Sequence, residues 1–224
     1  MTKLAIADHP SPNCGPRRDG LHPALIVIHY TAMENAQAAI GRLCDPEAEV
    51  SAHYVIANRG EITQLVPEDQ RAWHAGAGAW AGMDDINSRS IGIELDNLGT
   101  HPFSEPQMAA LEHLLKGIMA RWAIPAAGVI GHSDMAPGRK GDPGPHFDWA
   151  RLARQGLARA IGGDAGPQGQ SFDSFRKAAR ALGYTAEVDD DALLAAVRLR
   201  YRPYAQGPLC ASDFAVLGET DLQT

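Results

Sequence analysis

Cysteine is scarce in this chain, and its three cysteines, Cys14, Cys44 and Cys210, stand far apart. No Cys-x-x-Cys pair occurs, so the sequence predicts neither a thiol redox site nor a structural zinc site of the cysteine-rich kind. A Gly-x-Ser-x-Gly elbow is absent as well, and Cys44 falls in a predicted helix, which argues against a hydrolase with a serine or cysteine nucleophile. We expect the three cysteines to be ordinary thiols.

Long apolar runs are missing too. No stretch approaches the ~20 apolar residues of a membrane span, so no span is predicted. The N-terminal apolar segment is too short for the core of a secretory signal, because His9, Pro10 and Pro12 interrupt it. These features predict a cytoplasmic protein. If an export signal has been removed from the sequence, the alternative is a periplasmic or outer-membrane-attached protein.

The chain has no excess of basic residues. Its formal net charge is -7 and its pI is near 5.7, whereas proteins that bind nucleic acid usually carry a basic stripe. Nucleic acid is therefore not an expected partner, and the sequence leaves the oligomeric state open. With 224 residues, of which 45% are hydrophobic and 21% charged, the chain is long enough for one full-sized domain and a small one.

Strand and helix patterns alternate along the first 161 residues. The segment 90–95 alternates apolar and other residues, which places Glu94 on the face opposite its isoleucines. Capping residues before apolar positions at helical spacing predict helices, such as the one that Ser104 begins. The expected order is a lead-in at 1–23, strand 24–30, helix 36–43, hairpin 53–66, loop 67–89, strand 90–95, helix 105–122, strand 129–130, loop 131–148 and helix 149–161. This order predicts an α/β domain with a mixed central sheet covered by helices on both faces.

The composition changes after residue 161. Four glycines and one proline make the nine residues 162–170 a predicted linker. Beyond the linker, apolar positions at helical spacing predict three short helices in a small all-α unit at 171–224. The alternative is a helical extension that only packs on the main domain at 1–161, because three short helices bury little core alone.

The loop 131–148 is rich in glycine and proline and holds three chemically distinctive residues, His132, Lys140 and Asp142. His132 and Asp142 could supply two of the three protein ligands of a catalytic zinc, which leaves the fourth position for water. His29, which ends an apolar run far upstream, could supply the third. The alternative for each histidine is a hydrogen-bonded structural role, which is the commoner one at the end of a strand.

Five sequence blocks follow one another in an order typical of a known family. They are Ile28-His-Tyr-Thr31, Val50-Ser-Ala-His-Tyr-Val55, Arg71-Ala-Trp-His-Ala-Gly76, Asn87-Ser-Arg-Ser-Ile-Gly-Ile-Glu-Leu95, and Gly131-His-Ser-Asp through Asp142-Pro-Gly-Pro145. Together they closely resemble the zinc-dependent N-acetylmuramoyl-L-alanine amidases of the second amidase family, the AmpD/AmiD type, which are related to peptidoglycan recognition proteins. The resemblance covers about residues 20–160, and five ordered blocks are more specific than any one of them.

The resemblance implies a peptidoglycan-recognition-protein-like amidase fold. It also implies hydrolysis of the amide between N-acetylmuramic acid, or its 1,6-anhydro form, and L-alanine, in peptidoglycan turnover or recycling. By the same resemblance, His29, His132 and Asp142 bind Zn2+, Glu94 is the proton shuttle, and Lys140 places an ammonium beside the developing oxyanion. The implied partner is peptidoglycan or a muropeptide. A non-catalytic recognition protein that binds muropeptide with the same fold is the alternative.

The C-terminal unit resembles, more weakly, the three-helix peptidoglycan-binding module that follows the catalytic domain in some of these amidases. We therefore expect a peptidoglycan-binding-like domain there, with the packing-only extension as the alternative.

Two further histidines occur in the blocks. His53 and His74 are not expected as ligands, because a fourth protein ligand would close the position that hydrolysis needs. His74 and Tyr30 are instead candidates for contact with substrate, with simple packing as the alternative for His74. The phage lysozyme-type amidases carry a catalytic tyrosine where this chain has Ala52, and a cysteine ligand where it has Asp142. Both differences place the chain with the AmpD/AmiD type and favour the glutamate mechanism.

Overall fold

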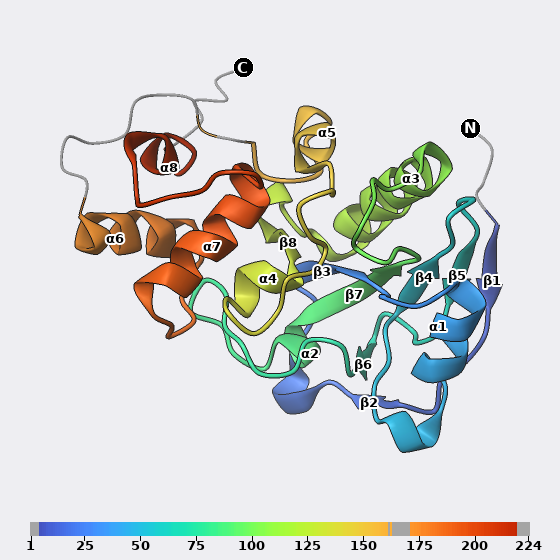
Figure 1. Cartoon of the computed structure of the whole chain (residues 1–224). Helices are drawn as coiled ribbons and strands as arrows, with labels where there is room; N and C mark the ends of the chain where they lie inside the picture. Colours follow the sequence, from blue (N-terminus) through green and yellow to red (C-terminus); the bar gives the residue numbers. More distant parts are fainter. Residues whose placement is uncertain (1–4, 161, 163–170, 219–224) are drawn as a thin grey trace.

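A six-stranded sheet forms the centre of the computed structural model, which describes residues 5–160, 162 and 171–218 (Figure 1). Four neighbouring strands run parallel, the strand beside them pairs antiparallel, and the edge strand beyond it pairs parallel with that strand. A separate antiparallel pair lies outside this sheet. The strand order is β1 (Ile6–Asp8), β5 (Ile62–Gln64), β4 (Tyr54–Ile56), β7 (Ser90–Leu95), β3 (Leu25–Tyr30) and β8 (Val129–Gly131), and the separate pair is β2 (Cys14–Pro16) with β6 (Gln70–Ala72). The mixed sheet and the hairpin of β4 and β5 confirm the sequence prediction.

Strand β3 is buried on both faces. Ile26 and Ile28 point to one face and Val27 to the other, and none of the three is exposed. This is typical of a parallel strand with layers on both sides. His29 follows on the face of Val27, and the neighbouring strand β7 places Glu94 in register with it. Alternation along the two strands therefore brings both polar side chains to one face at the end of the sheet.

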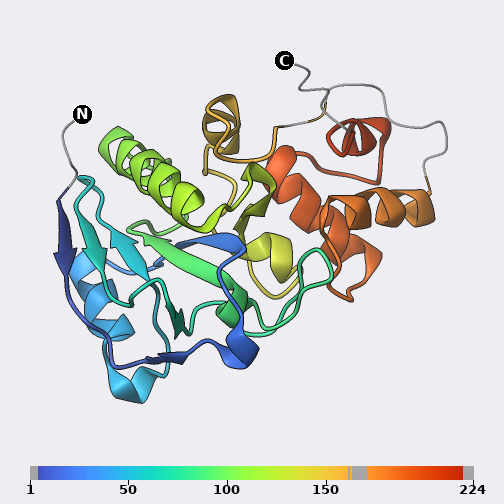
Figure 2. The same cartoon turned by 180° about the vertical axis from the view of Figure 1, so that it is seen from behind.

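Helices α3 (Glu105–Trp122) and α5 (Trp149–Arg154) cover the opposite face of the sheet (Figures 1 and 2). Helix α3 begins where the hydroxyl of Ser104 accepts the Gln107 N–H. It ends at Ala123, which adopts a left-handed conformation with φ of 52°. Leu111 and Ile118 are fully buried on its inner side and fix the helix to the sheet.

The face that carries His29 is divided between two groups of helices. Helix α1 (Ala36–Leu43) packs Ile40 and Leu43 near Val55 of β4. Helices α6 (Phe172–Leu182), α7 (Asp190–Tyr201) and α8 (Ala211–Ala215) share one hydrophobic core with Val27 of β3 and Ile130 of β8. Figure 2 shows α1 and the three C-terminal helices at opposite ends of the molecule. The ends of the central strands are therefore left accessible between the two groups.

Short elements occur where the sequence predicted only irregular chain. The lead-in contributes β1 and β2, the loop 67–89 contributes β6 and α2 (Ile86–Arg89), and the loop 131–148 begins as α4 (His132–Met135). The local patterns missed β1, β2 and β6 because each pairs with a strand far away in sequence. Single turns of 3-10 helix lie at Arg18–Gly20, Pro46–Ala48 and Ala126–Gly128.

One boundary in the C-terminal half differs from the prediction, and one predicted segment falls mostly outside the described residues. The helix expected at 149–161 ends at Arg154, and Gly156 adopts a φ of 68° just after it. The predicted linker lies, apart from Gly162, outside the described residues. The three predicted C-terminal helices are present as α6, α7 and α8. No helix in the described part of the chain is both long enough and apolar enough to cross a bilayer.

Candidate metal centre

Two histidines and an aspartate converge at the end of the sheet. His29 lies in β3, and His132 begins α4 directly after β8, where the register pairs Ile28 with Gly131. The two histidines are therefore neighbours across the strands. The Nδ1 atom of each faces Oδ2 of Asp142, at 2.8 Å for His29 and 3.1 Å for His132. The three potential ligand atoms all lie within 4.8 Å of one another.

Proton positions indicate that a cation belongs between these atoms. Nε2 of His132 lies 2.9 Å from the carbonyl oxygen of Ala75, which can only accept, so in the neutral form of the ring, the form that binds metals, Nε2 holds the proton and Nδ1 turns a lone pair toward Asp142. Burial, with a smaller contribution from the charge of His132, lowers the pKa of His29 to about 4, so its ring is neutral near pH 7. An Nδ1 lone pair that faces the Asp142 carboxylate with no proton between them is repelled by its negative charge, and a bound cation would remove this repulsion. Two imidazoles and one carboxylate therefore fit a divalent metal ion.

Glu94 lies beside this group on the same face of the sheet. In β7 it pairs with His29 on one side and with Val55 of β4 on the other. Its Oε2 atom is buried and has no hydrogen-bond partner among the described residues, which is uncommon for a buried polar atom. Burial, and to a smaller extent the charge of Asp142, raises the pKa of Glu94 well above its usual value. Burial therefore favours the protonated form of Glu94 relative to an exposed carboxylate.

Lys140 stands at the rim of the site, on the loop between α4 and Asp142. Its side chain is exposed and lines the cleft, and its positive charge opposes part of the rise in the pKa of Glu94. The guanidinium of the preceding Arg139 donates hydrogen bonds to the carbonyl oxygens of Ala75 and Ala77. These bonds fix the loop that carries Lys140 to the segment around Ala75, whose carbonyl also accepts from His132.

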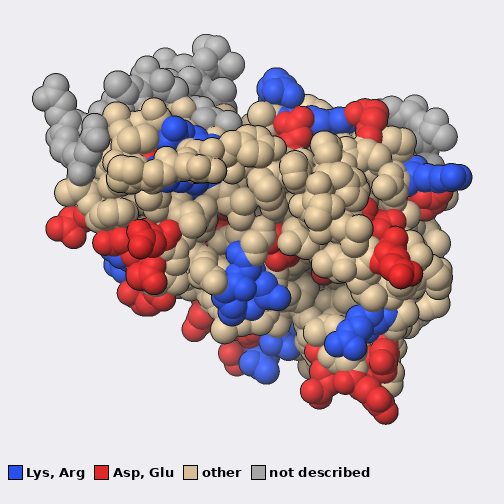
Figure 3. Space-filling view, in the orientation of Figure 1, with Lys and Arg blue, Asp and Glu red and all other residues tan. Residues whose placement is uncertain are grey.

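The site opens into a cleft of about 400 Å³. Helix α1 contributes Arg42 to one wall, residues 139–142 form part of another, and the ends of β3 and β7 form the floor. Figure 3 shows Lys and Arg side chains on both sides of a hollow on this face. A cleft of this size takes a small ligand or a short segment of a polymer. Its basic rim suits a ligand that carries carboxylates.

Tyr30 and His74 both border this cleft. Tyr30 is half-buried and follows His29, which keeps it a candidate for contact with substrate. His74 differs, because both of its ring nitrogens already meet protein groups. Its Nδ1 lies 3.0 Å from Nε2 of His29, and its Nε2 lies 3.2 Å from the hydroxyl of Ser90. A substrate could therefore meet only the carbon atoms or the face of this ring.

His53 is not part of the potential metal-binding group of His29, His132 and Asp142, and it is fully buried. Its Nδ1 accepts the N–H of Gly92 at 3.0 Å, and its Nε2 donates to the carbonyl of Gln70 at 3.1 Å. Burial, followed by the positive charge of Arg17, lowers the pKa of His53 to about 3. His53 therefore joins the strands as a neutral hydrogen-bonding residue.

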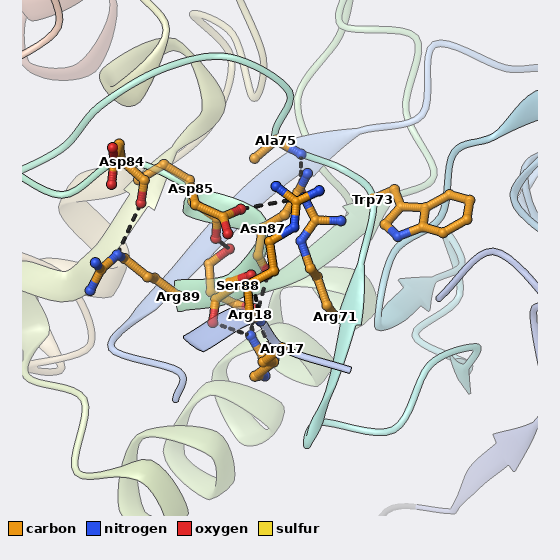
Figure 4. Close-up of polar contacts among 12 residues, drawn as sticks. Arg17, Arg18, Arg71, Trp73, Ala75, Asp84, Asp85, Asn87, Ser88 and Arg89 are labelled. Carbon is orange, nitrogen blue, oxygen red and sulfur yellow. Dashed lines mark hydrogen bonds and ion pairs between the residues drawn. The ribbon is translucent and has the colours of Figure 1, made fainter. Parts of the chain in front are cut away.

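Asn87 and Ser90 hold the segment around His74, and neither was singled out from the sequence. Oδ1 of Asn87 accepts the backbone N–H of His74 at 3.0 Å and of Ala75 at 2.8 Å. Figure 4 shows the Asn87 side chain reaching Ala75. The available signal was the block 87–95, where these polar side chains precede a buried strand and must find hydrogen-bond partners.

Residues 19–145 match the N-acetylmuramoyl-L-alanine amidase family. The chain is 42% identical over 149 residues to the N-acetylmuramoyl-L-alanine amidase AmiD of Escherichia coli, in an alignment that covers 59% of this chain and 53% of AmiD. It is 37% identical over 160 residues to the 1,6-anhydro-N-acetylmuramyl-L-alanine amidase AmpD of Citrobacter freundii, which covers 64% of this chain and 86% of AmpD. The alignments therefore span about half the length of AmiD and most of AmpD.

Solved structures with the same fold include two muropeptide complexes. AmiD from E. coli with anhydro-N-acetylmuramic acid-L-Ala-D-gamma-Glu-L-Lys superposes with a TM-score of 0.74 at 31% identity and covers 89% of each chain. AmpDH3 from Pseudomonas aeruginosa with anhydromuramic pentapeptide superposes with a TM-score of 0.76 at 32% identity and covers 93% of each chain. These similarities confirm the fold that the sequence blocks predicted.

Proposed function

The chain belongs to the N-acetylmuramoyl-L-alanine amidase family, and we propose that it hydrolyses the amide between N-acetylmuramic acid, or its 1,6-anhydro form, and L-alanine of the peptide stem. One observation carries the proposal: His29, His132 and Asp142 converge beside Glu94, whose Oε2 has no hydrogen-bond partner in the described part of the chain, at the floor of a cleft. The muropeptides bound to AmiD and AmpDH3 support this class of substrate. The corresponding process is peptidoglycan turnover or recycling.

We infer that the metal is Zn2+, because two histidine nitrogens and one carboxylate form a common set of protein ligands in catalytic zinc sites. The bound ion would polarise the scissile carbonyl and lower the pKa of the attacking water. The task of His29, His132 and Asp142 is to hold it in a fixed place. The hydrogen bond from His132 to the carbonyl of Ala75 supports that task, because it orients the ring before the metal ion binds.

Glu94 carries the proton transfers. Amide hydrolysis needs a base that takes a proton from water and an acid that gives one to the leaving nitrogen. Glu94 lines the cleft and has a carboxylate oxygen without a partner among the described residues, so it is available to a group in the cleft. The burial that raises the pKa of Glu94 makes its protonated form easier to reach than that of an exposed carboxylate. A shuttle that acts in both directions must reach both forms.

Lys140 stabilises the charge that develops on the carbonyl oxygen of the substrate. Its ammonium is on the rim of the same cleft, and the loop that carries it is fixed by Arg139. A positioned positive charge of this kind acts most strongly on the transition state, where the oxygen is an anion. Tyr30 and the basic rim would contact the rest of the muropeptide.

The test follows release of the peptide stem from a purified anhydromuramyl tripeptide by liquid chromatography and mass spectrometry. The zinc-loaded protein should release the peptide. Glu94→Gln keeps the shape of the side chain but cannot carry the proton, so its rate should fall on the order of 10²-fold or more while its zinc content is unchanged. Glu61→Gln, an exposed substitution outside the cleft, is the matched control and should keep the wild-type rate.

Two outcomes would contradict the proposal in different ways. Binding of the muropeptide by the zinc-loaded protein without any release of peptide would favour the recognition-protein alternative. A Glu94→Gln rate within a few-fold of wild type would assign the proton transfers to another group. The cytoplasmic location expected from the sequence stays a prediction, which cell fractionation checks.

A further inference from the structure

A chain of hydrogen bonds leads from Ser90 to the metal site. The hydroxyl of Ser90 lies 2.6 Å from the carbonyl oxygen of Ile86, which can only accept, so the hydroxyl proton points there. The same hydroxyl oxygen lies 3.2 Å from Nε2 of His74, and it must therefore accept a proton from that nitrogen. In the neutral ring Nδ1 of His74 is then unprotonated, and it lies 3.0 Å from Nε2 of His29.

These assignments fix the proton on His29. Because Nδ1 of His74 can only accept, Nε2 of His29 is the donor and carries the proton of the neutral ring. Nδ1 of His29 then holds a lone pair, and it faces Oδ2 of Asp142 at 2.8 Å. The hydrogen-bond chain therefore selects the tautomer of His29 that can bind a metal through Nδ1.

The backbone around His74 is built to hold this ring in place. A Cβ atom on Gly92 of β7 would lie 2.5 Å from Cγ of His74 and 2.7 Å from its Nδ1, so only glycine leaves room for the ring over the strand. Oδ1 of Asn87 accepts the N–H groups of His74 and Ala75. The carbonyl of Ala75 accepts from His132. One anchored dipeptide, His74 and Ala75, thus orients both ligand histidines.

We propose that His74 is a positioning residue that sets metal affinity by holding His29 with Nε2 protonated and Nδ1 toward the metal, and that Ser90 fixes His74 in the matching tautomer. The proposal rests on the metal assignment of the proposed function. It differs from a role of His74 as a substrate ligand, because neither ring nitrogen is available to the cleft. Partners that orient metal ligands in this way typically raise metal affinity by about 10–100-fold.

Three variants separate positioning from packing. His74→Leu fills the site but removes the acceptor, so the Nε2 proton of His29 loses its partner. His74→Asn places Oδ1 about where Nδ1 was and keeps an acceptor for His29. Ser90→Ala removes only the group that fixes the tautomer of His74. Ser88→Ala, a fully buried serine in the same segment, is the matched control for Ser90→Ala, and the exposed His113→Asn is the control for the histidine variants.

The first measurement is the zinc dissociation constant of the full-length protein, by competition with a chromophoric chelator. We expect binding about 10–100-fold weaker in His74→Leu, a loss below about tenfold in Ser90→Ala, and values close to wild type in His74→Asn and both controls. The melting temperature of each metal-free protein is measured beside it. A purely structural role would lower the melting temperature of His74→Leu and His74→Asn alike and would not restore zinc affinity in the asparagine variant.

The second measurement reads the tautomer directly, from long-range proton–nitrogen NMR spectra of the histidine rings in the metal-free protein. Wild type should show His29 with its proton on Nε2, and His74→Leu should show a mixture of tautomers. Wild-type zinc affinity in His74→Leu, or a His29 proton on Nδ1 in the wild type, would overturn the proposal. If the wild type bound no zinc, the proposed function would fail, while the NMR result would still decide the role of His74.

Discussion

Replacement of Arg200 by methionine should destabilise the protein strongly, because Arg200 neutralises a buried carboxylate. Arg200 of α7 is 4% exposed, and its guanidinium donates to Oδ2 of Asp134 at 2.5 Å. The same guanidinium lies 3.9 Å from the centre of the Trp149 ring. Asp134 is fully buried, and its other oxygen accepts the hydroxyl of Tyr184 at 2.7 Å. The charge of Asp134 is therefore balanced by a residue of the C-terminal helices.

In Arg200→Met, Asp134 keeps the hydrogen bond from Tyr184 but loses the charge that balances it. Removal of one partner from a buried ion pair costs about 3–5 kcal/mol in the free energy of unfolding. For a chain of this size, this corresponds to a fall of about 9–15 °C in melting temperature. An exposed pair provides the contrast. Arg180 and Glu187 lie 2.7 Å apart with side chains 47% and 83% exposed, and Arg180→Met should cost less than about 1 kcal/mol.

Urea unfolding of the metal-loaded proteins measures these free energies. The set contains Arg200→Met, Asp134→Asn, the double variant and Arg180→Met as the control. Because Asp134→Asn removes the charge that Arg200→Met leaves unbalanced, the double variant should be more stable than the sum of the single effects predicts, by about 2 kcal/mol or more. An Arg200→Met protein within about 1 kcal/mol of wild type, or additive single effects, would refute this reasoning.

Three further predictions concern the metal, the pH dependence and the C-terminal helices. His29→Ala and Asp142→Ala should each reduce zinc, measured by elemental analysis, from about one ion per chain to almost none; unchanged zinc in both would remove the ligand assignment. Because the pKa of His53 falls from 6.5 to about 3 in the fold, its contribution to stability is present above pH 6.5 and is lost as the pH falls, by ~2 kcal/mol at pH 5. In urea unfolding, the free energy of unfolding of His53→Gln should fall by about 2 kcal/mol less than that of the wild type between neutral pH and pH 5. An equal fall in both proteins would contradict this prediction. A chain that ends at residue 160 lacks Arg200 and Tyr184, so we expect a lower melting temperature and weaker activity on both intact sacculi and soluble muropeptide; a normal melt with a loss on sacculi alone would support a separate binding module.

Much of the candidate site could be predicted because its residues end strongly patterned strands. The apolar run of β3 is buried on both faces and delivers His29 to the end of the sheet, as its sequence indicates. The alternation in β7 likewise places Glu94 opposite the core. What the pattern could not supply is the strand order. Only the pairing of Ile28 with Gly131 brings His132 beside His29, and that pairing joins segments about a hundred residues apart.

Contacts that depend on distant partners explain the rest of what was missed. The strands β1 and β2 are three residues each and exist because β5 and β6 pair with them. Ser90 reads as the first residue of a strand, and its hydrogen bond to His74 follows from the path of a long loop over Gly92. Propensity and periodicity describe neighbours in sequence, so they carry no information about such pairs.

The C-terminal helices show why a boundary drawn by composition differs from one drawn by energetics. Composition predicts a linker at 162–170, yet the helices that begin after residue 170 share a core with Val27 and Ile130 of the central strands. Arg200 and Tyr184 also complete the hydrogen bonding of Asp134, two residues after the predicted ligand His132. A unit that only tethered the enzyme to a polymer would need neither contact. The C-terminal helices are therefore expected to stabilise the segment that carries His132, whether or not they also bind peptidoglycan, and the Arg200→Met and truncated proteins measure those two roles separately.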